Sequence, residues 1–246
     1  MPVPRFYCPA PLFYDITFEL PSQAAHHAHR VLRLRVHDAV QVFDGLGQAL
    51  DATIIEISGK RVVLGKLLPR AVELPSPLHI VLAQAMCSSE KMDWVVQKAT
   101  ELGAAAIQPV QTERSVARLS GERAEKRADH WRSVTIAACE QCGRNLLPQV
   151  DVPQEFTAWL AQLRSLPGTK FILMPEGTAS LHAQPKPQGA VTLLIGPEGG
   201  FSAGELIMAQ QAGCVAVSLG PRVLRTETAA VAGIAALQTL WGDFSP

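Results

Sequence analysis

The sequence lacks the features of a membrane protein, a secreted disulfide-rich domain or a strongly basic protein. No apolar run reaches the length of about 18 residues that a transmembrane helix needs, and residues 1–7 contain no signal-peptide apolar segment. Basic and acidic residues number 22 each, so any RNA site must be a local basic patch. The chain has only five cysteines, and we expect them to be reduced in a cytoplasmic protein.

Apolar side chains, in contrast, are abundant. They make up 48% of the 246 residues, enough to form the core of one large domain or two modest ones. Residues 1–70 predict a small, mostly β unit, in which a hairpin turns at Ser58-Gly59 and one helix covers 26–34. The proline-rich stretch 74–77 is typical of a linker, so we predict domains at 1–72 and 76–246.

The second predicted domain alternates strands with helices. Strands are expected at 79–84, 106–110, 170–174, 192–195 and 215–219, and helices at 90–102, 122–142, 203–212 and 227–241. This alternation predicts an α/β fold with a mostly parallel sheet covered on both faces. In the last helix, we expect Thr226 to be the N-cap and Ala230, Ile234, Leu237 and Trp241 to form an apolar stripe.

Two of these strands end in Gly-Pro turns that are followed by polar residues. Ile195 precedes Gly196-Pro197-Glu198-Gly199-Gly200, and Leu219 precedes a Gly-Pro turn that continues to Arg225-Thr226-Glu227. Because loops at the carboxyl ends of parallel strands meet at one edge of a sheet, we expect a single composite pocket. Neither loop has the dinucleotide or Walker A spacing, so a phosphate-bearing cofactor is not favoured. The alternative for the first loop is a tight turn without a ligand.

Three further features have competing interpretations. Arg225 could pair with Glu198 or Glu227 as part of the structure, or it could stabilise negative charge on a substrate. The C-x-x-C spacing at Cys139 and Cys142 has no second ligand pair, so we interpret it as structural. The histidines at 26, 27 and 29 have no carboxylate nearby and are typical of a solvated or RNA-facing surface rather than a metal site.

The two C-terminal loops, taken together, resemble a known family. Ile195 to Gly200 and Leu219 to Thr228 are similar to the signature of the RsmE family of 16S ribosomal RNA uridine-N3 methyltransferases. Further similarity occurs in order along the chain at 4–7, 29–33, 43–45, 90–103, 113–115 and 137–145. The resemblance implies a C-terminal α/β domain of the SPOUT (trefoil-knot) class, with a parallel sheet, behind a small PUA-like β-barrel domain.

The resemblance also implies a cofactor and a set of site residues. The cofactor is S-adenosyl-L-methionine, which carries no phosphate. From their proximity within the two loops, we expect Arg225 to stabilise the uracil anion and Glu198 or Glu227 to assist its deprotonation. The residues expected to surround the cofactor are Leu173, Ile195, Gly196, Pro197, Glu198, Gly199, Gly200, Leu219, Gly220, Leu224, Arg225, Thr226, Glu227, Thr228 and Ala229. The residues expected to contact RNA are Arg5, Arg30, Arg33, Lys91, Lys98, Arg114 and Arg144.

The expected partners are 16S rRNA or the small ribosomal subunit and a second copy of the chain, without a metal or a membrane. Two alternatives stay open at this stage. One is a SPOUT methyltransferase that modifies the ribose 2′-oxygen, and the other is a non-catalytic RNA-binding protein that assists ribosome assembly. Binding of S-adenosylmethionine would exclude the second, and mapping of the methylated atom would separate the first.

Overall fold

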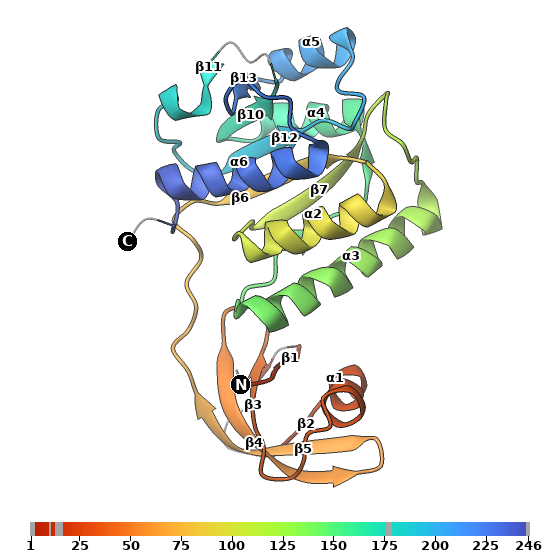
Figure 1. The fold of residues 1–246 in the computed structure, drawn as a ribbon, viewed down its shortest axis with the longest axis vertical. Helices are drawn as coiled ribbons and strands as arrows, with labels where there is room; N and C mark the ends of the chain where they lie inside the picture. The colour runs from red at the N-terminus through yellow and green to blue at the C-terminus, as the bar shows by residue number, and fades with distance from the viewer. Residues whose placement is uncertain (1–2, 10, 13–16, 176–178, 245–246) are drawn as a thin grey trace. The chain divides into compact units, whose positions relative to one another are not determined.

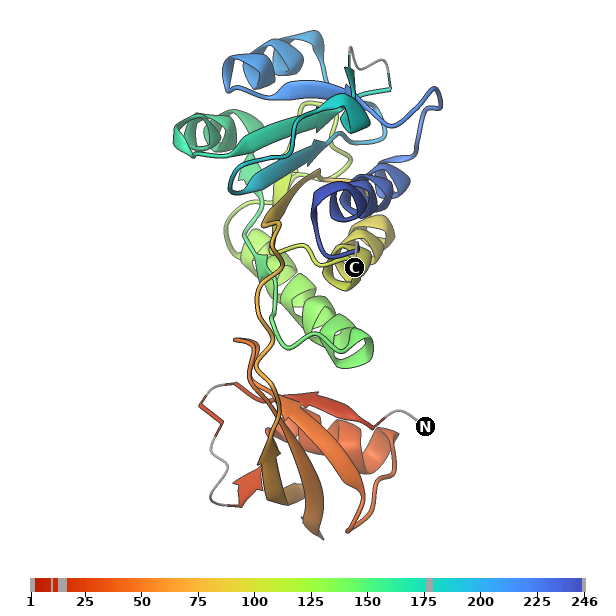
Figure 2. The same cartoon turned by 90° about the vertical axis from the view of Figure 1, so that its left-hand side faces the viewer.

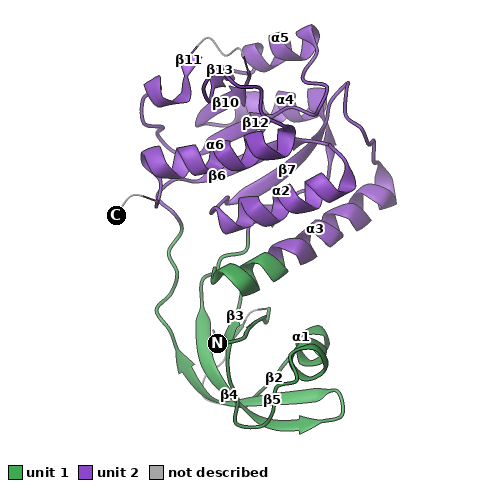
Figure 3. Ribbon diagram, viewed as in Figure 1, with its two compact units in different colours: residues 1–75, 136–147 green, residues 76–135, 148–246 purple. Residues whose placement is uncertain are grey.

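The computed structural model describes residues 3–9, 11–12, 17–175 and 179–244. The chain divides into two compact units, residues 1–75 with 136–147 and residues 76–135 with 148–246 (Figure 3). Residues 136–147, which fall in the second predicted domain, therefore pack with the N-terminal unit. The division falls inside one long helix, α3 (Gly121–Cys142).

The first unit is built on a five-stranded sheet in the order β1-β3-β4-β5-β2. The strands are β1 (Arg5–Tyr7), β2 (Phe18–Glu19), β3 (Ala39–Phe43), β4 (Ala49–Ser58) and β5 (Arg61–Pro69). Among the described strands of this sheet, β1 and β3 pair in parallel and the other neighbours are antiparallel. The expected hairpin is the β4–β5 pair, which turns through Gly59 at a φ of +61°. Positive φ is the conformation that glycine adopts most easily, and this accounts for the tight connection.

The helical part of this unit differs from the prediction. Helix α1 is Ser22–His26, and it continues as a π-helical turn, His27–Val31. The chain therefore leaves the helix before the predicted end at residue 34, and Arg33 takes a positive φ of 56°. Alanines of this segment, among them Ala25 and Ala28, are buried in the core of the unit.

The second unit contains a parallel sheet in the order β11-β13-β10-β12-β6-β7-β8, with β9 also pairing with β7 (Figure 1). Its strands are β6 (Ile80–Ala85), β7 (Ala106–Gln111), β8 (Gln149–Val150), β9 (Gln154–Glu155), β10 (Thr169–Leu173), β11 (Ala179–Ser180), β12 (Val191–Ile195) and β13 (Val215–Ser218). A 3₁₀ turn, Leu181–Ala183, follows β11. The sheet is parallel as predicted because each of its long strands is followed by a crossover segment.

Helices cover both faces of this sheet (Figure 2). Helices α2 (Ser89–Glu101) and α6 (Thr226–Trp241) lie on one face, and α4 (Phe156–Ser165) and α5 (Ala203–Gln211) lie on the other. Successive strand residues alternate between the two cores: Leu193 packs with the α2–α6 side, and Leu194 packs with the α4–α5 side. This two-sided burial explains why the strands are continuous apolar runs in the sequence.

Helix α6 follows β13 but packs elsewhere in the sheet, against α2, β6 and β12. Its residues Ala230, Ile234 and Leu237 are fully buried, as the apolar stripe predicts, and Trp241 stacks on Phe171 with ring centroids 6.3 Å apart. The segment between β13 and α6 therefore crosses the carboxyl ends of β10 and β12. This crossing brings the second Gly-Pro loop to the first.

Candidate functional site

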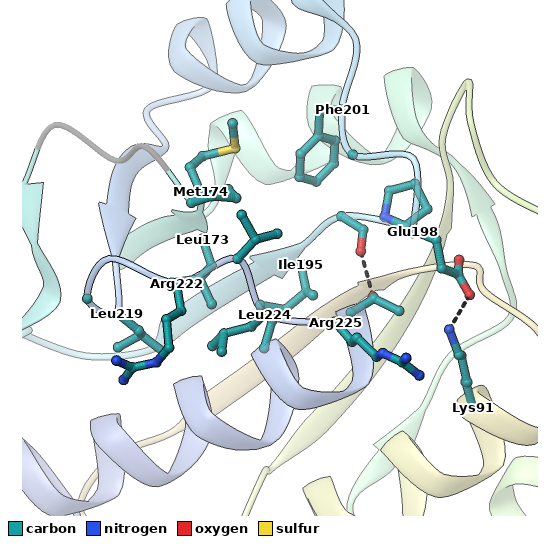
Figure 4. Close-up of a pocket in the computed structure, with 18 residues that line it drawn as sticks. Lys91, Leu173, Met174, Ile195, Glu198, Phe201, Leu219, Arg222, Leu224 and Arg225 are labelled. Carbon is teal, nitrogen blue, oxygen red and sulfur yellow. Dashed lines mark hydrogen bonds and ion pairs between the residues drawn. The ribbon is translucent and has the colours of Figure 1, made fainter.

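A pocket of about 370 Å³ lies at the carboxyl ends of β10, β12 and β13 (Figure 4). Three loops form it: residues 173–175 after β10, residues 195–201 after β12, and residues 219–226 before α6. Its apolar lining comes largely from Leu173, Ile195, Leu219 and Leu224, which point into it. The two Gly-Pro loops thus meet in one pocket, as the strand-end argument predicts.

The start of α6 is fixed to the first loop by a buried hydrogen-bonded chain. Gln84 Nε2 donates to Thr226 Oγ1 at 2.9 Å, and Thr226 Oγ1 donates to the carbonyl of Gly196 at 2.6 Å. The expected N-cap role of Thr226 is wrong, because Arg225 occupies the N-cap position and provides no side-chain cap. The hydroxyl instead joins β6, the 196–200 loop and α6.

The 196–200 loop is held by further contacts on both sides. Gly200 has a φ of +66°, and its amide donates to the carbonyl of Pro197 at 2.9 Å. The ring of Phe201 lies close behind Gly196, where a Cβ atom would be only 3.0 Å from the ring edge. Arg114 Nη1 donates to the carbonyl of Gly199 at 2.8 Å. A side chain at position 196 would therefore require the Phe201 ring to shift by a few tenths of an ångström, so packing rather than the backbone angles favours glycine here.

Two carboxylates and one ammonium group gather beside the pocket. Lys91 Nζ lies 2.9 Å from Glu198 Oε1 and 3.5 Å from Glu227 Oε2. Partial burial acts to raise the pKa of Glu198, but the hydrogen bond from Lys91 and backbone amides outweigh it, so this pKa lies below its ordinary value. The same hydrogen bond raises the pKa of Lys91. The start of α2, the loop after β12 and the start of α6 contribute these groups, and all three lie at the same edge of the sheet.

Arg225 lines the pocket with an exposed side chain, and the ion pairs among the described residues do not include it. The structural Arg225 pair considered from sequence is therefore not formed, because Lys91 occupies both carboxylates. Arg222 also lines the pocket (Figure 4). A guanidinium that is not paired with a protein carboxylate is available to form an ion pair with a negatively charged group of a ligand.

Most of the expected cofactor residues line the pocket. Gly199, Glu227 and Thr228 are the exceptions among them. Sequence reasoning missed Met174, Pro175, Phe201, Arg222 and Val223, and it placed Lys91 with RNA rather than in the pocket. Arg222 and Val223 could have been found from the sequence, because both lie within the segment from Leu219 to Thr228 that resembles the family signature.

The expected RNA residues of the first unit fall into two groups. Arg30 and Arg33 are exposed on the helical segment and the turn after it. Arg5, in contrast, donates to Gln41 Oε1 at 2.8 Å and to Asn145 Oδ1 at 2.6 Å, and lies 4.9 Å from the Phe43 ring centroid. Arg5 therefore has a structural role, and its Nη2 also donates to the carbonyl of Arg144.

In the second unit, the expected RNA residues are engaged by protein groups. Lys98 Nζ lies 2.7 Å from Glu101 Oε1, Lys91 contacts the two pocket carboxylates, and Arg114 supports the 196–200 loop. Among the described residues, no group of three or more His, Cys, Asp or Glu side chains could hold a metal ion. No disulfide joins the five cysteines, all of which lie in the described part of the chain. None of the described helices combines the length and apolar character needed to span a membrane.

Comparison with known proteins identifies the family. A family profile described as an RNA methyltransferase domain matches residues 74–238, and one described as an RNA methyltransferase PUA domain matches residues 20–67. Ribosomal RNA small subunit methyltransferase E of Buchnera aphidicola subsp. Schizaphis graminum is 34% identical, over 99% of this chain and 98% of its own. The chain belongs to the ribosomal RNA small subunit methyltransferase E family.

Solved structures of similar proteins agree with this membership. The ribosomal RNA small subunit methyltransferase E of Neisseria gonorrhoeae, solved with S-adenosyl methionine, is 40% identical with a TM-score of 0.91, covering 99% of this chain and all of its own. A methyltransferase of Legionella pneumophila, solved with the same cofactor, is 36% identical with a TM-score of 0.93 and the same coverage. The fold class is thereby confirmed: a SPOUT α/β domain with a parallel sheet and a small N-terminal PUA-like β domain.

Proposed function

We propose that the protein transfers the methyl group of S-adenosylmethionine to N3 of a uridine in 16S ribosomal RNA. One observation carries the proposal: the two Gly-Pro loops and the end of β10 enclose one apolar pocket with a guanidinium, that of Arg225, in its lining. Family membership and the donor bound in the Neisseria and Legionella relatives support it. Residues 76–246 would carry out the transfer, and residues 1–72 would bind RNA, as the PUA match supports.

The pocket suits a phosphate-free nucleoside. Its volume of about 370 Å³ lies in the range of small-molecule sites. Leucine and isoleucine side chains would cover the two faces of an adenine, and the backbone of the glycine loops is available to its polar edge. The buried chain from Gln84 through Thr226 to Gly196 would hold these two loops at the separation that the donor needs.

The reaction requires help at the uracil. N3 of uracil carries a proton, and its lone pair becomes nucleophilic only as that proton leaves. S-adenosylmethionine supplies an electrophilic methyl group on a sulfonium. Arg225 would stabilise the negative charge that develops on the uracil carbonyls, and Glu198 or Glu227 would accept the proton. N3 then bonds the methyl carbon while the carbon–sulfur bond breaks and its electron pair stays on sulfur.

Single-turnover methylation tests the role of Arg225. With donor and RNA saturating, Arg225→Ala should slow methyl transfer by roughly 100-fold, the range seen when one charge-stabilising group is removed. Arg164→Ala, an exposed arginine of α4 on the other face of the sheet, is the matched control. Equal rates for the two variants would remove Arg225 from the mechanism.

Two measurements separate the alternatives. Calorimetric titration with S-adenosylmethionine should show binding, and an assembly factor without a donor site should give no heat. Nucleoside analysis of the product should show methylation on the base, which blocks pairing and stops reverse transcription. Methyl groups on the ribose instead would favour the 2′-O-methyltransferase.

We also propose that the protein acts as a homodimer on 16S rRNA or the small subunit, in the cytoplasm. The resemblance to the RsmE family supports the dimer, and Val223, which is 79% exposed at the pocket, is an apolar residue that a second copy could cover. Light scattering in solution tests this, and a monomer at micromolar concentration would contradict it. Arg30 and Arg33 would contact the RNA, and their exposure supports this role.

A further inference from the structure

Three separate segments meet at the ammonium group of Lys91. Lys91 lies in the first turn of α2, Glu198 in the loop after β12, and Glu227 in the first turn of α6. Their side chains are 29%, 34% and 18% exposed, so the group is partly withdrawn from water. The backbone of Ser88, at the N-cap of α2, also acts to lower the pKa of Glu198. The positive end of the helix dipole favours a carboxylate there.

Lys91 is the cation that compensates both carboxylates. Within the described residues, Lys91 is the only basic group within ion-pair distance of either carboxylate. Glu227 Oε2 is buried and has no hydrogen-bond partner, so the ammonium at 3.5 Å is its main compensation. The neighbouring thiol of Cys87 is uncharged, since burial raises its pKa to about 12. Arg225, in the adjacent loop, is exposed. Removal of the ammonium would therefore leave two carboxylates side by side in a partly buried site.

We propose that Lys91 is a positioning residue that holds Glu198 and Glu227 together and so keeps the 196–200 loop and the start of α6 in the form that binds the methyl donor. The inference rests on the proposed function, because it assumes that the pocket binds S-adenosylmethionine. It differs from the RNA role expected from sequence, since the ammonium is directed at the two carboxylates. It also gives Glu198 an anchoring role through its contact with Lys91, so that of the two carboxylates named above, Glu227 is the one left to accept the N3 proton.

Donor binding without RNA tests the proposal. Lys91→Met keeps the length and apolar character of the side chain and removes the charge. Its dissociation constant for S-adenosylmethionine near pH 7 should rise by roughly tenfold, between the effects of exposed and of buried ion pairs. Lys126→Met removes a lysine–glutamate pair on the outer surface of α3 and should leave donor affinity unchanged. Lys91→Arg should restore most of the affinity.

A pH series separates charge compensation from simple packing. In Lys91→Met, burial still raises the pKa of Glu198 and the ammonium no longer lowers it, so this carboxylate should take up a proton at a higher pH than in the original protein. The repulsion from Glu227 is then relieved, and the affinity deficit should shrink, while the affinity of the original protein changes little. Adding Glu198→Gln to Lys91→Met should recover part of the affinity at neutral pH for the same reason.

The results of these titrations distinguish failure of the Lys91 proposal from failure of the proposed function. If the original protein binds the donor and Lys91→Met binds it equally well, the clamp is refuted while the proposed function stands. If Lys91→Met is weak at every pH and neither Glu198→Gln nor arginine rescues it, Lys91 is only a packing residue. If the original protein binds no donor, both the proposed function and the clamp fail. Circular dichroism of each variant, recorded before titration, shows whether loss of binding follows from loss of folding.

Discussion

Replacing Thr226 with valine should reveal how strongly the crossing segment depends on one hydroxyl group. Valine has nearly the shape of threonine, so the change removes the two hydrogen bonds at 2.6 and 2.9 Å with little change in packing. At about 1 kcal/mol for each bond, the free energy of unfolding should fall by about 2 kcal/mol. The side chain is buried, so water cannot easily replace the lost partners.

Thermal unfolding followed by circular dichroism measures this loss. A decrease of about 2 kcal/mol corresponds to a fall in Tm of roughly 4–8 °C for a domain of this size class. Donor affinity should fall as well, because the carbonyl of Gly196 would no longer be tied to α6.

Thr226→Ser is the matched control. Serine keeps the hydroxyl and loses one methyl group, which costs about 1 kcal/mol. Valine should therefore be the more damaging substitution although it fills the site better. If Thr226→Val unfolds at the same temperature as the original protein, or above Thr226→Ser, the hydroxyl bridge does not stabilise the fold as argued.

Three further changes test other parts of the chain. Burial raises the pKa of Glu140, so its ionisation costs stability above that pKa; Glu140→Gln should unfold at a higher temperature near neutral pH and match the original protein near about pH 4. Gly233→Ala would place a Cβ atom 2.7 Å from Leu193 Cδ2, so urea titration should show a loss of about 1–3 kcal/mol despite the better helix propensity of alanine. Arg33→Ala should lower the salt dependence of binding to an rRNA fragment by about one unit, measured by fluorescence anisotropy, and an unchanged slope would remove Arg33 from the RNA surface.

Much of the second unit could be predicted because its strands are buried on both faces. A run such as Val191–Ile195 is continuously apolar and ends in Gly-Pro, so both the strand and its loop are visible in the sequence. The pocket followed from one rule, that carboxyl ends of parallel strands share an edge. Helix α4 (Phe156–Ser165) was not predicted, although Phe156, Trp159, Leu160 and Leu163 form a buried helical stripe that periodicity could have identified.

Other features depend on contacts between distant residues and leave no local signal. The hydroxyl of Thr226 resembles a helix cap in the sequence, yet its partners are 30 and 142 positions away. Lys91 looks like a solvated lysine of a helix start, and only the arrival of Glu198 and Glu227 makes it a pocket residue. The path of the chain between β13 and α6 could not be predicted from the sequence either. Hydrophobic patterns show which residues are buried and with what period, but they do not show the order in which segments cross.

The pocket edge is best understood as one connected set of contacts between loops and helix starts. Lys91 joins α2 to the 196–200 loop and α6, Thr226 joins that loop to α6, and Glu205 of α5 joins Ser202 to the amide of Glu113. Residues that share a loop in this way should not act independently.

In a double-mutant cycle, Lys91→Met and Thr226→Val together should weaken donor binding by less than the product of their separate effects, since either change already releases the 196–200 loop from α6. Gly233→Ala lies further along α6, where it packs against Leu193 of β12 and contacts neither Lys91 nor Thr226, so it should combine with Lys91→Met multiplicatively. Independent effects of Lys91 and Thr226 would mean that the two contacts hold different parts of the pocket and that the loop is not positioned as a unit.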